Sequence, residues 1–341
     1  MSMRIAVIGL GFMGSTHLKA WRNIPEAELV AVYSRDEQKL TGDLSQIQGN
    51  LGGPGETFDF SNVRKYRDLT ELLSDPDVEA VDICLPTHLH YATALSALRA
   101  DKHVLVEKPI ALEGKMADEL VQEAKARNRT FMAAHVLRFV PSYRVLAEEL
   151  ATGKYGPVRS AMFRRRCAAP VWSKWLGDAD KSGGGVFDLL IHDIDFALML
   201  FGLPDAVSAT GYEDLPLGID TIHATLYYSD TYTVVIAGGW FHKKAFPFSM
   251  EYTIAADGGT FEYSSLRGDE VTFYECSGEQ RPLELRKEDG FEAELRYFLT
   301  ACMEGSRPNY CAPEDSAAAV KVARVLLEAR KRNGDKIPCS I

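Results

Sequence analysis

The chain has 341 residues, of which 46% are hydrophobic and 25% are charged, as is usual for globular proteins that fold in water. This length is too great for one ordinary core, so we expect two domains. The net charge of −10 argues against nucleic acid or an anionic membrane as a partner, because either would select a basic face.

The cysteines and the apolar segments indicate the compartment. The six cysteines form no CxxC pair, which favours free thiols over a disulfide framework or a zinc site. No apolar run approaches the length of a membrane span, and no signal peptide precedes the first expected strand. We therefore expect a cytoplasmic protein that holds no metal.

A glycine-rich turn follows the first expected strand, residues 4–8. Its sequence is Gly9-Leu10-Gly11-Phe12-Met13-Gly14, a G-x-G-x-x-G motif that leads into a helical pattern over residues 15–22. The first glycine permits the turn, the second lets a pyrophosphate approach the backbone, and the third allows the helix and strand to pack closely. A second strand, residues 28–33, follows at βαβ spacing. The pattern predicts a dinucleotide site that includes Phe12 and Met13.

The end of this second strand bears on the choice of dinucleotide. An acidic residue there binds the ribose hydroxyls of NAD, whereas an arginine suits the 2′-phosphate of NADP. The chain has Ser34-Arg35-Asp36, in which the carboxylate comes two residues late for NAD. We predict that Ser34 and Arg35 contact the cofactor, which is NADP or NAD with NADP favoured. The alternative is that Arg35 is an exposed side chain without a ligand.

Helices and strands then alternate along the first part of the chain. After a surface loop over 41–63, we expect helices over 68–73, 91–100 and 116–128 and strands over 80–85, 103–106 and 130–134. This order is typical of a doubly wound parallel sheet, an α/β fold whose ligands bind beyond the carboxyl ends of the strands.

Two of these strand ends carry polar side chains. We expect cofactor contacts from Leu85, Pro86, Thr87, His88, His90, Glu107 and Lys108. The two histidines at H-x-H spacing could suggest a metal, but packing around a nicotinamide explains them without further ligands. Lys108 is either a surface lysine paired with Glu107 or a group that faces the ligand.

The rest of the chain predicts a second domain of α+β type. We divide the protein into a dinucleotide-binding domain, residues 1–134, and a substrate-binding and oligomerisation domain, residues 135–341. Strands over 158–166, 221–228 and 231–241, with shorter ones to about residue 285, predict a large, mostly antiparallel sheet with helices on one face. Other helices are expected over 142–151, 291–304 and 313–332, the last of which is expected to pack back at the domain junction. Trp172 and Trp175 either wall a sugar-sized pocket or pack in the core.

Residues 183–196 predict a helix that three glycines open. Asp188, His192 and Asp195 are four and three residues apart, so they share one face of an α-helix. Two interpretations fit this stripe. The histidine is either hydrogen-bonded within a capped helix, or it is a general base with an orienting carboxylate.

Five motifs in order give the chain a family resemblance. They are Gly9-x-Gly11-x-x-Gly14, Pro86-Thr87-His88-x-His90, Glu107-Lys108-Pro109, Arg138-Phe139-x-Pro141 and Gly184-Gly185-x-x-Asp188-x-x-x-His192. With these motifs the chain resembles the Gfo/Idh/MocA family, which includes glucose–fructose oxidoreductase and inositol dehydrogenase. It departs from many NAD-using members where Ser34-Arg35 replaces their acidic residue.

The resemblance implies a two-domain NAD(P)-dependent oxidoreductase that acts on sugars, polyols and related small molecules. It implies catalytic roles for Lys108, Asp188 and His192 and substrate contacts for Arg138 and Asp195, to which we add Trp172. It also implies a homodimer or homotetramer formed through the second sheet. Two alternatives stay open: a non-catalytic dinucleotide sensor on the same fold, and a glycoside hydrolase that uses NAD transiently.

Overall fold

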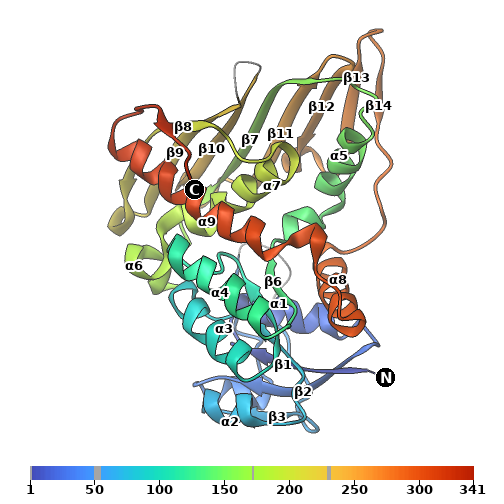
Figure 1. Ribbon diagram of the computed structural model, residues 1–341, viewed down its shortest axis with the longest axis vertical. Helices are drawn as coiled ribbons and strands as arrows, with labels where there is room; N and C mark the ends of the chain where they lie inside the picture. Colours follow the sequence, from blue (N-terminus) through green and yellow to red (C-terminus); the bar gives the residue numbers. More distant parts are fainter. Residues whose placement is uncertain (1, 50–54, 171–172, 229–231) are drawn as a thin grey trace. The chain divides into compact units, whose positions relative to one another are not determined.

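The computed structural model describes residues 2–49, 55–170, 173–228 and 232–341. They form two compact units, each built from segments that are distant in the sequence (Figure 1). The first unit comprises Met1–His135 and Gly290–Ala317, and the second comprises Val136–Asp289 and Ala318–Ile341. The division expected from the sequence falls after residue 134 and does not assign 290–317 to the first unit.

The first unit contains a parallel sheet with the strand order β3-β2-β1-β4-β5-β6. Its strands are β1 (Met3–Ile8), β2 (Ala27–Tyr33), β3 (Arg64–Tyr66), β4 (Ala80–Ile83), β5 (His103–Glu107) and β6 (Phe131–Ala134). The apolar residues of β1 and β4 are buried on both faces, as parallel strands between helix layers require. The doubly wound fold is confirmed, with β3 as a strand that the sequence did not predict.

The helices of the first unit follow the order of a doubly wound fold. They are α1 (Phe12–Trp21), α2 (Leu69–Ser74), α3 (His90–Arg99), α4 (Gly114–Ala126) and α8 (Gly290–Glu304), with short 3-10 helices at Lys39–Thr41, Thr87–Leu89 and Asn309–Cys311. Right-handed crossovers to either side of β1 place α1 and α3 on opposite faces of the sheet. Helix α8 packs on α1, where Arg296 pairs with Glu26 at 2.9 Å and the ring of Phe291 lies 6.1 Å from that of His17.

The second unit contains a mixed sheet with the order β14-β13-β12-β11-β7-β10-β9-β8-β15. Its strands are β7 (Val158–Ala168), β8 (Ala206–Asp214), β9 (Ile219–Tyr228), β10 (Tyr232–His242), β11 (Ser249–Ala256), β12 (Gly259–Ser264), β13 (Val271–Glu275), β14 (Gln280–Pro282) and β15 (Ile337–Pro338). The strands pair antiparallel except β7 with β10. Buried and more exposed residues alternate along β9, as expected when helices cover one face. The expected mostly antiparallel sheet is confirmed.

The helices of the second unit include α5 (Pro141–Ala151), α6 (Ala179–Ser182), α7 (Ile191–Phe201) and α9 (Pro313–Lys331). Helix α7 packs against β7 and β10, and α9 runs across the boundary of the two units at residue 317. Short 3-10 helices lie at Val136–Arg138, Lys174–Gly177, Leu215–Leu217 and Ser265–Arg267.

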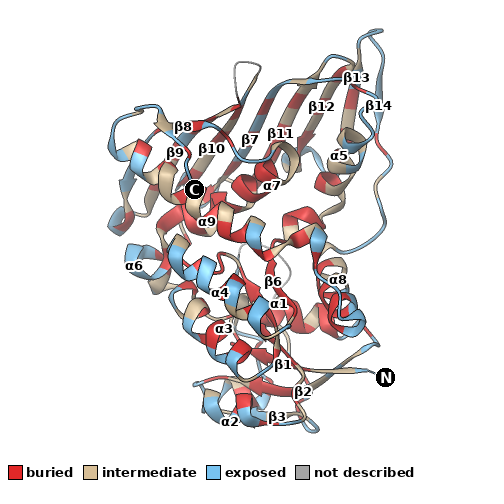
Figure 2. Cartoon of the chain, in the orientation of Figure 1, coloured by how far each residue is buried: buried red, intermediate tan, exposed pale blue. Residues whose placement is uncertain are grey.

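Each unit has its own buried core, and Figure 2 shows buried residues on helices such as α7 and α8 as well as on the strands. In the second unit, aromatic rings from α5, α7 and the sheet pack edge to face. The ring of Tyr143 lies 5.1 Å from Phe196 and 5.2 Å from Tyr252. Such pairs add about 0.5–1.5 kcal/mol beyond the area that they bury. Within the described part of the chain, no helix is both long and apolar enough to cross a bilayer.

Candidate cofactor and catalytic site

The glycine turn between β1 and α1 forms a backbone cradle. A Cβ on Gly9, whose φ is +102°, would lie 2.8 Å from the carbonyl oxygen of Cys84, and one on Gly14 would lie 1.9 Å from that of Gly9. A Cβ on Gly11 would meet no atom of the described chain within 4 Å. The first and third glycines are therefore needed for packing, whereas the second borders open space.

The N-terminus of α1 suits an anion in that space. Helix α1 begins at Phe12, its N-cap Gly11 offers no side-chain hydrogen bond, and its first turn carries no acidic residue. The first amide groups of a helix lack partners within the helix and carry its positive dipole end. These features fit the pyrophosphate of a dinucleotide, as the sequence predicts. Phe12 itself packs on Gly49, where an added Cβ would meet the ring at 2.1 Å.

Arg35 is an exposed cation at the ribose end of this region. Ser34 follows β2 and is buried, and its hydroxyl accepts a hydrogen bond from the amide of Asp36 at 3.1 Å. The Asp36 carboxylate accepts the amide of Gln38 at 3.0 Å. Arg35 is exposed and forms no hydrogen bond or ion pair within the described residues. Its guanidinium is thus available to a phosphate.

The segment after β4 separates the two histidines of the H-x-H pair. His88 is exposed, whereas His90 is buried at the start of α3. The ring nitrogens of His90 lie 2.8 Å from the carbonyl oxygen of Pro109 and 2.6 Å from that of Leu85. His90 therefore ties the carboxyl ends of β4 and β5 together, and its contact with a cofactor stays a prediction.

Lys108 follows the last residue of β5 and is only partly buried. The preceding Glu107 is buried, and its Oε2 accepts the main-chain N–H of Lys108 at 3.0 Å. Its Oε1 lies 3.1 Å from His17 Nε2 on α1. Sequence reasoning did not single out His17, although it lies three residues after the last glycine of the motif, on the buried face of α1.

The predicted catalytic helix of the second unit is not one continuous α-helix. Gly183 and Gly184 have φ of 73° and 74°, a π-helix spans Val186–Leu190, and α7 starts only at Ile191. The amide of Gly185 donates to the Asp220 carboxylate at 2.6 Å, and a Cβ on Gly184 would lie 2.4 Å from that same carboxylate. The glycines thus wrap around Asp220. Helical structure runs from Gly184 to Phe201, as expected of a helix that the glycines open, but Val186–Leu190 are π-helical where an α-helix was expected.

Asp188 and His192 stand out by their exposure in this segment. From Gly184 to Leu198 they alone are not buried. Asp188 belongs to the π-helix and His192 to the first turn of α7. Short π-helical turns inside helices are frequent at functional sites.

Two buried ion pairs hold α7 in place. Arg138 donates to both carboxylate oxygens of Asp195 at 2.8 and 2.6 Å, and Arg165 of β7 donates to those of Asp193 at 2.7 and 3.1 Å. All four side chains are at most 3% exposed. Burial alone would lower the pKa of Arg165, but the Asp193 carboxylate raises it, so this guanidinium stays charged. Arg138 and Asp195 bind one another, and their contact with substrate stays a prediction.

The two predicted tryptophans differ in what the structure describes. Trp172 lies outside the described residues. Trp175 is partly buried and packs against an apolar cluster that includes Cys167, Leu189 and Trp240. For Trp175 this contact matches the alternative of core packing.

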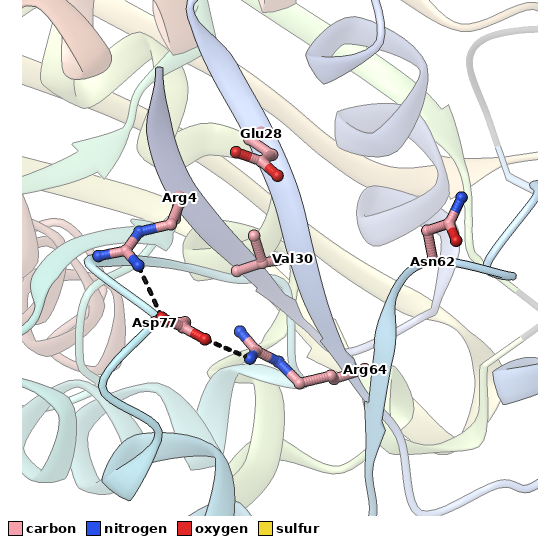
Figure 3. Close-up of a pocket in the computed structure, with 6 residues that line it drawn as sticks. All are labelled: Arg4, Glu28, Val30, Asn62, Arg64 and Asp77. Carbon is pink, nitrogen blue, oxygen red and sulfur yellow. Dashed lines mark hydrogen bonds and ion pairs between the residues drawn. The ribbon is translucent and has the colours of Figure 1, made fainter. Parts of the chain in front are cut away.

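A polar hollow of about 310 Å³ lies away from the glycine turn (Figure 3). It is lined by Arg4, Glu28, Val30, Asn62, Arg64 and Asp77. Arg4 and Arg64 both pair with Asp77, at 2.7 and 2.6 Å. Most of these residues lie in the amino-terminal halves of β1, β2 and β3 or just before them, and Asp77 precedes β4, whereas dinucleotides bind beyond the carboxyl ends. Charged side chains of the hollow thus pair with one another, and the hollow is not the cofactor site.

Comparison with known families identifies the class of this protein. Residues 3–135 match the oxidoreductase family with an NAD-binding Rossmann fold (GFO_IDH_MocA), and residues 143–262 match the GFO/IDH/MocA C-terminal domain. The chain belongs to the Gfo/Idh/MocA family of oxidoreductases, and the resemblance inferred from the sequence is confirmed.

Individual relatives act on varied substrates. The chain is 26% identical over 318 residues to 4-carboxy-2-hydroxymuconate-6-semialdehyde dehydrogenase of Sphingobium sp., covering 90% of this chain and 92% of that protein. It is 30% identical over 201 residues to myo-inositol 2-dehydrogenase of Thermotoga maritima, covering 59% and 55%. The chain spans about half the length of several curated relatives that it matches.

Among solved structures, levoglucosan dehydrogenase in complex with NADH and levoglucosan is similar in fold. Its TM-score is 0.87 at 18% identity, and the match covers 100% of both chains. This likeness supports the two-domain fold. The NAD-binding description belongs to the family model that matches residues 3–135.

Proposed function

We propose that the protein catalyses reversible hydride transfer between a nicotinamide cofactor and a secondary alcohol or ketone carbon of a sugar, polyol or related small molecule. The observation that carries this proposal is that Asp188 and His192 are partly exposed in an otherwise buried segment, which two buried ion pairs join to its neighbours. The glycine turn, with open space at Gly11, supplies the cofactor cradle.

Each side chain has a distinct role in this reaction. The bound nicotinamide accepts or supplies the hydride. In the oxidative direction His192 takes the hydroxyl proton as the hydride leaves carbon, because imidazole titrates near neutral pH and works in both directions. Asp188 orients His192 and the substrate. Lys108 donates a hydrogen bond to the reacting oxygen and stabilises the charge that develops on it.

Activity measurements test this proposal directly. Oxidation of myo-inositol and levoglucosan is followed with NAD⁺ and NADP⁺, together with reduction of their keto forms. We expect Lys108→Ala and His192→Ala to lower kcat about 10²- to 10⁴-fold, the usual effect of losing one acid–base group. Cofactor Kd should stay within about twofold, and Lys125→Ala serves as an exposed control. Near-normal rates in both variants would refute the assignment.

The same assays separate the two alternatives. A dinucleotide sensor binds NADPH but gives no net reduction with any substrate of the panel. A glycoside hydrolase that uses NAD transiently cleaves a glycoside without net formation of NADH. Net NADH or NADPH formation with a free sugar or polyol distinguishes the dehydrogenase from both.

We further propose that the protein is a homodimer or homotetramer joined through the uncovered face of the second sheet. Val235, Met162 and Thr253 are register neighbours across β10, β7 and β11, and Met162 is 40% exposed. Apolar side chains at this part of the face, which Arg164 borders on β7, are suited to contact with a partner. Met162→Glu should dissociate the assembly in sedimentation velocity. A monomeric wild-type protein would contradict this proposal.

A further inference from the structure

A buried cluster of charged groups lies beneath the strand ends of the first unit. His17 of α1 has its Nδ1 2.9 Å from Asp82 Oδ2 of β4 and its Nε2 3.1 Å from Glu107 Oε1 of β5. His17 and Asp82 are at most 1% exposed, and Glu107 is 6% exposed. Neither His17 nor Asp82 has a role in the proposed reaction, yet burial of such groups is costly unless they are paired.

The geometry shows how these charges are compensated. Burial alone would lower the pKa of His17, but the charge and hydrogen bond of Asp82 raise it well above its ordinary value. The ring is therefore an imidazolium with a carboxylate at each nitrogen. Trp21 Nε1 also donates to Asp82 Oδ2, at 2.7 Å. Burial raises the pKa of the neighbouring Cys84, so it remains a neutral thiol that donates to Asp82 at 3.5 Å.

A metal ion is the competing interpretation of the same cluster. Within the described chain, His17, Asp82 and Cys84 are the group whose ligand atoms lie close enough to hold one, within 4.8 Å of one another. A metal would require a deprotonated thiol and a free imidazole lone pair. The structure instead shows Asp82 bonded to His17, Trp21 and Cys84, with Glu107 facing the second ring nitrogen of His17, so these groups have partners within the protein without an ion.

The second oxygen of Glu107 connects the cluster to the proposed active site. Glu107 Oε2 accepts the main-chain N–H of Lys108 at 3.0 Å, while Oε1 faces His17. His17 also lies on the helix whose N-terminus forms the glycine cradle, one turn beyond Gly14. One imidazolium therefore links the phosphate-binding helix to the strand end that carries the lysine.

We propose that His17 is a positioning residue that acts through Glu107 to hold Lys108 in register with the cofactor cradle. This inference rests on the proposed function, in which Lys108 contacts the reacting oxygen. His17 fixes the Glu107 carboxylate, and the carboxylate fixes the backbone at Lys108. Without the imidazolium, the buried Glu107 carboxylate has no cation beside it. We expect its hydrogen bond with the Lys108 amide then to weaken. Misplacement of a reacting group by about 1 Å can cost on the order of 10²-fold in rate.

A double-mutant cycle tests this dependence. His17→Gln and Glu107→Gln are each made in the wild-type and Lys108→Ala backgrounds, and kcat is measured with myo-inositol and levoglucosan. We expect each single substitution to lower kcat about 10- to 100-fold in the wild-type background and less than twofold when Lys108 is absent. A merely structural role would give the same loss in both backgrounds and would overturn the inference.

The matched control is His103→Gln at the other end of β5. His103 Nδ1 accepts the amide of Thr130 at 3.0 Å, so this variant also removes a histidine hydrogen bond from the same sheet. We expect it to leave kcat unchanged. If Lys108→Ala itself keeps a normal kcat, the proposed function and this inference both fail. If Lys108→Ala is impaired and the cycle is additive, only this inference fails.

A second measurement needs no substrate. In protein labelled with ¹⁵N-lysine, the Lys108 amide resonance is assigned by its loss in Lys108→Arg. His17→Gln should shift this resonance and speed exchange of its proton, whereas His103→Gln should leave both unchanged. An unperturbed Lys108 amide in folded His17→Gln would overturn the inference, as would a stoichiometric metal ion in the purified protein.

Discussion

The exposed guanidinium of Arg35 provides a test of cofactor choice at the scale of one residue. It has no protein partner within the described chain, and it follows β2, where the adenine ribose of a dinucleotide binds in this fold. Arg35→Ala should raise the Kd for NADPH about tenfold, because a charge-assisted contact to the 2′-phosphate is lost. The Kd for NADH should change less than twofold. Fluorescence titration measures both, and Arg67→Ala, which removes an exposed arginine paired with Glu37, is the control. An equal loss for both cofactors would contradict an NADP preference.

Two buried tyrosines differ in whether the hydroxyl group forms a hydrogen bond. Within the described residues the hydroxyl of Tyr143 has no hydrogen-bond partner, whereas that of Tyr252 donates to the carbonyl of Ser142 at 2.7 Å. A buried polar group without a partner costs free energy. Tyr143→Phe should therefore leave the free energy of unfolding unchanged or raise it by up to about 1 kcal/mol, and Tyr252→Phe should lower it by about 1 kcal/mol. Urea denaturation compares them, and a larger loss for Tyr143→Phe would contradict the assignment.

The site residues that the sequence predicted lie in short local motifs, whereas the contacts that it did not predict join residues far apart in the sequence. Gly9, Lys108 and His192 stand in recognisable patterns. The partners of His17 are 65 residues away at Asp82 and further still at Glu107, and no periodicity relates them. The ion pair between Arg138 and Asp195 was likewise not predicted from the sequence. Sequence reasoning named both residues but assigned them to substrate and not to each other.

At the scale of elements, the glycines of the turn have different roles: Gly14 is needed for packing, whereas Gly11 borders the space proposed for the cofactor. A Cβ at residue 14 collides with the backbone of Gly9, whereas one at residue 11 enters open space. Gly14→Ala should therefore lower Tm by several degrees, because the clash must move α1 or β1. Gly11→Ala should keep the wild-type Tm within about 1 °C and raise the Kd for NADPH at least tenfold, because the methyl group occupies the space of the pyrophosphate. Calorimetry and fluorescence titration measure these effects. Normal NADPH affinity in Gly11→Ala would contradict this position of the cofactor.

The sequence predicted long periodic elements well and short irregular ones poorly. Strands such as β1 and β10 and helices such as α4 have patterns that span several turns or pleats. The three-residue β3 is too short to show a pattern, and its pairing with β2 depends on the tertiary fold. The π-helix at Val186–Leu190 follows glycines that wrap around Asp220, which lies 35 residues further along the chain. Local propensity does not contain that contact.

At the scale of the molecule, the raised pKa of His17 makes stability depend on pH. Its pKa is raised in the folded state by Asp82, with Glu107 and the neutral Cys84 also facing the ring. A group whose folded pKa is raised contributes stability fully below its unfolded pKa of about 6.5 and loses it as pH rises toward the folded value. The Tm difference between wild type and His17→Gln should therefore be largest at pH 6 and shrink by pH 8. Calorimetry of both proteins measures it, and a difference that grows with pH would contradict a charged His17.

The interleaved segments of the two units have a consequence for biosynthesis. The strands of the first sheet are complete once residue 134 has left the ribosome, but α8, which packs on α1, belongs to the same unit and is encoded far downstream. About 180 further residues must be translated before the first unit has all its parts, which takes roughly 10–35 s at bacterial and eukaryotic elongation rates. During that interval the α8-facing side of α1, with Glu26 and His17 near it, has no cover from its own chain. We therefore expect synonymous codon changes within 136–289, which alter the time before α8 is made, to change the yield of folded protein without changing its sequence.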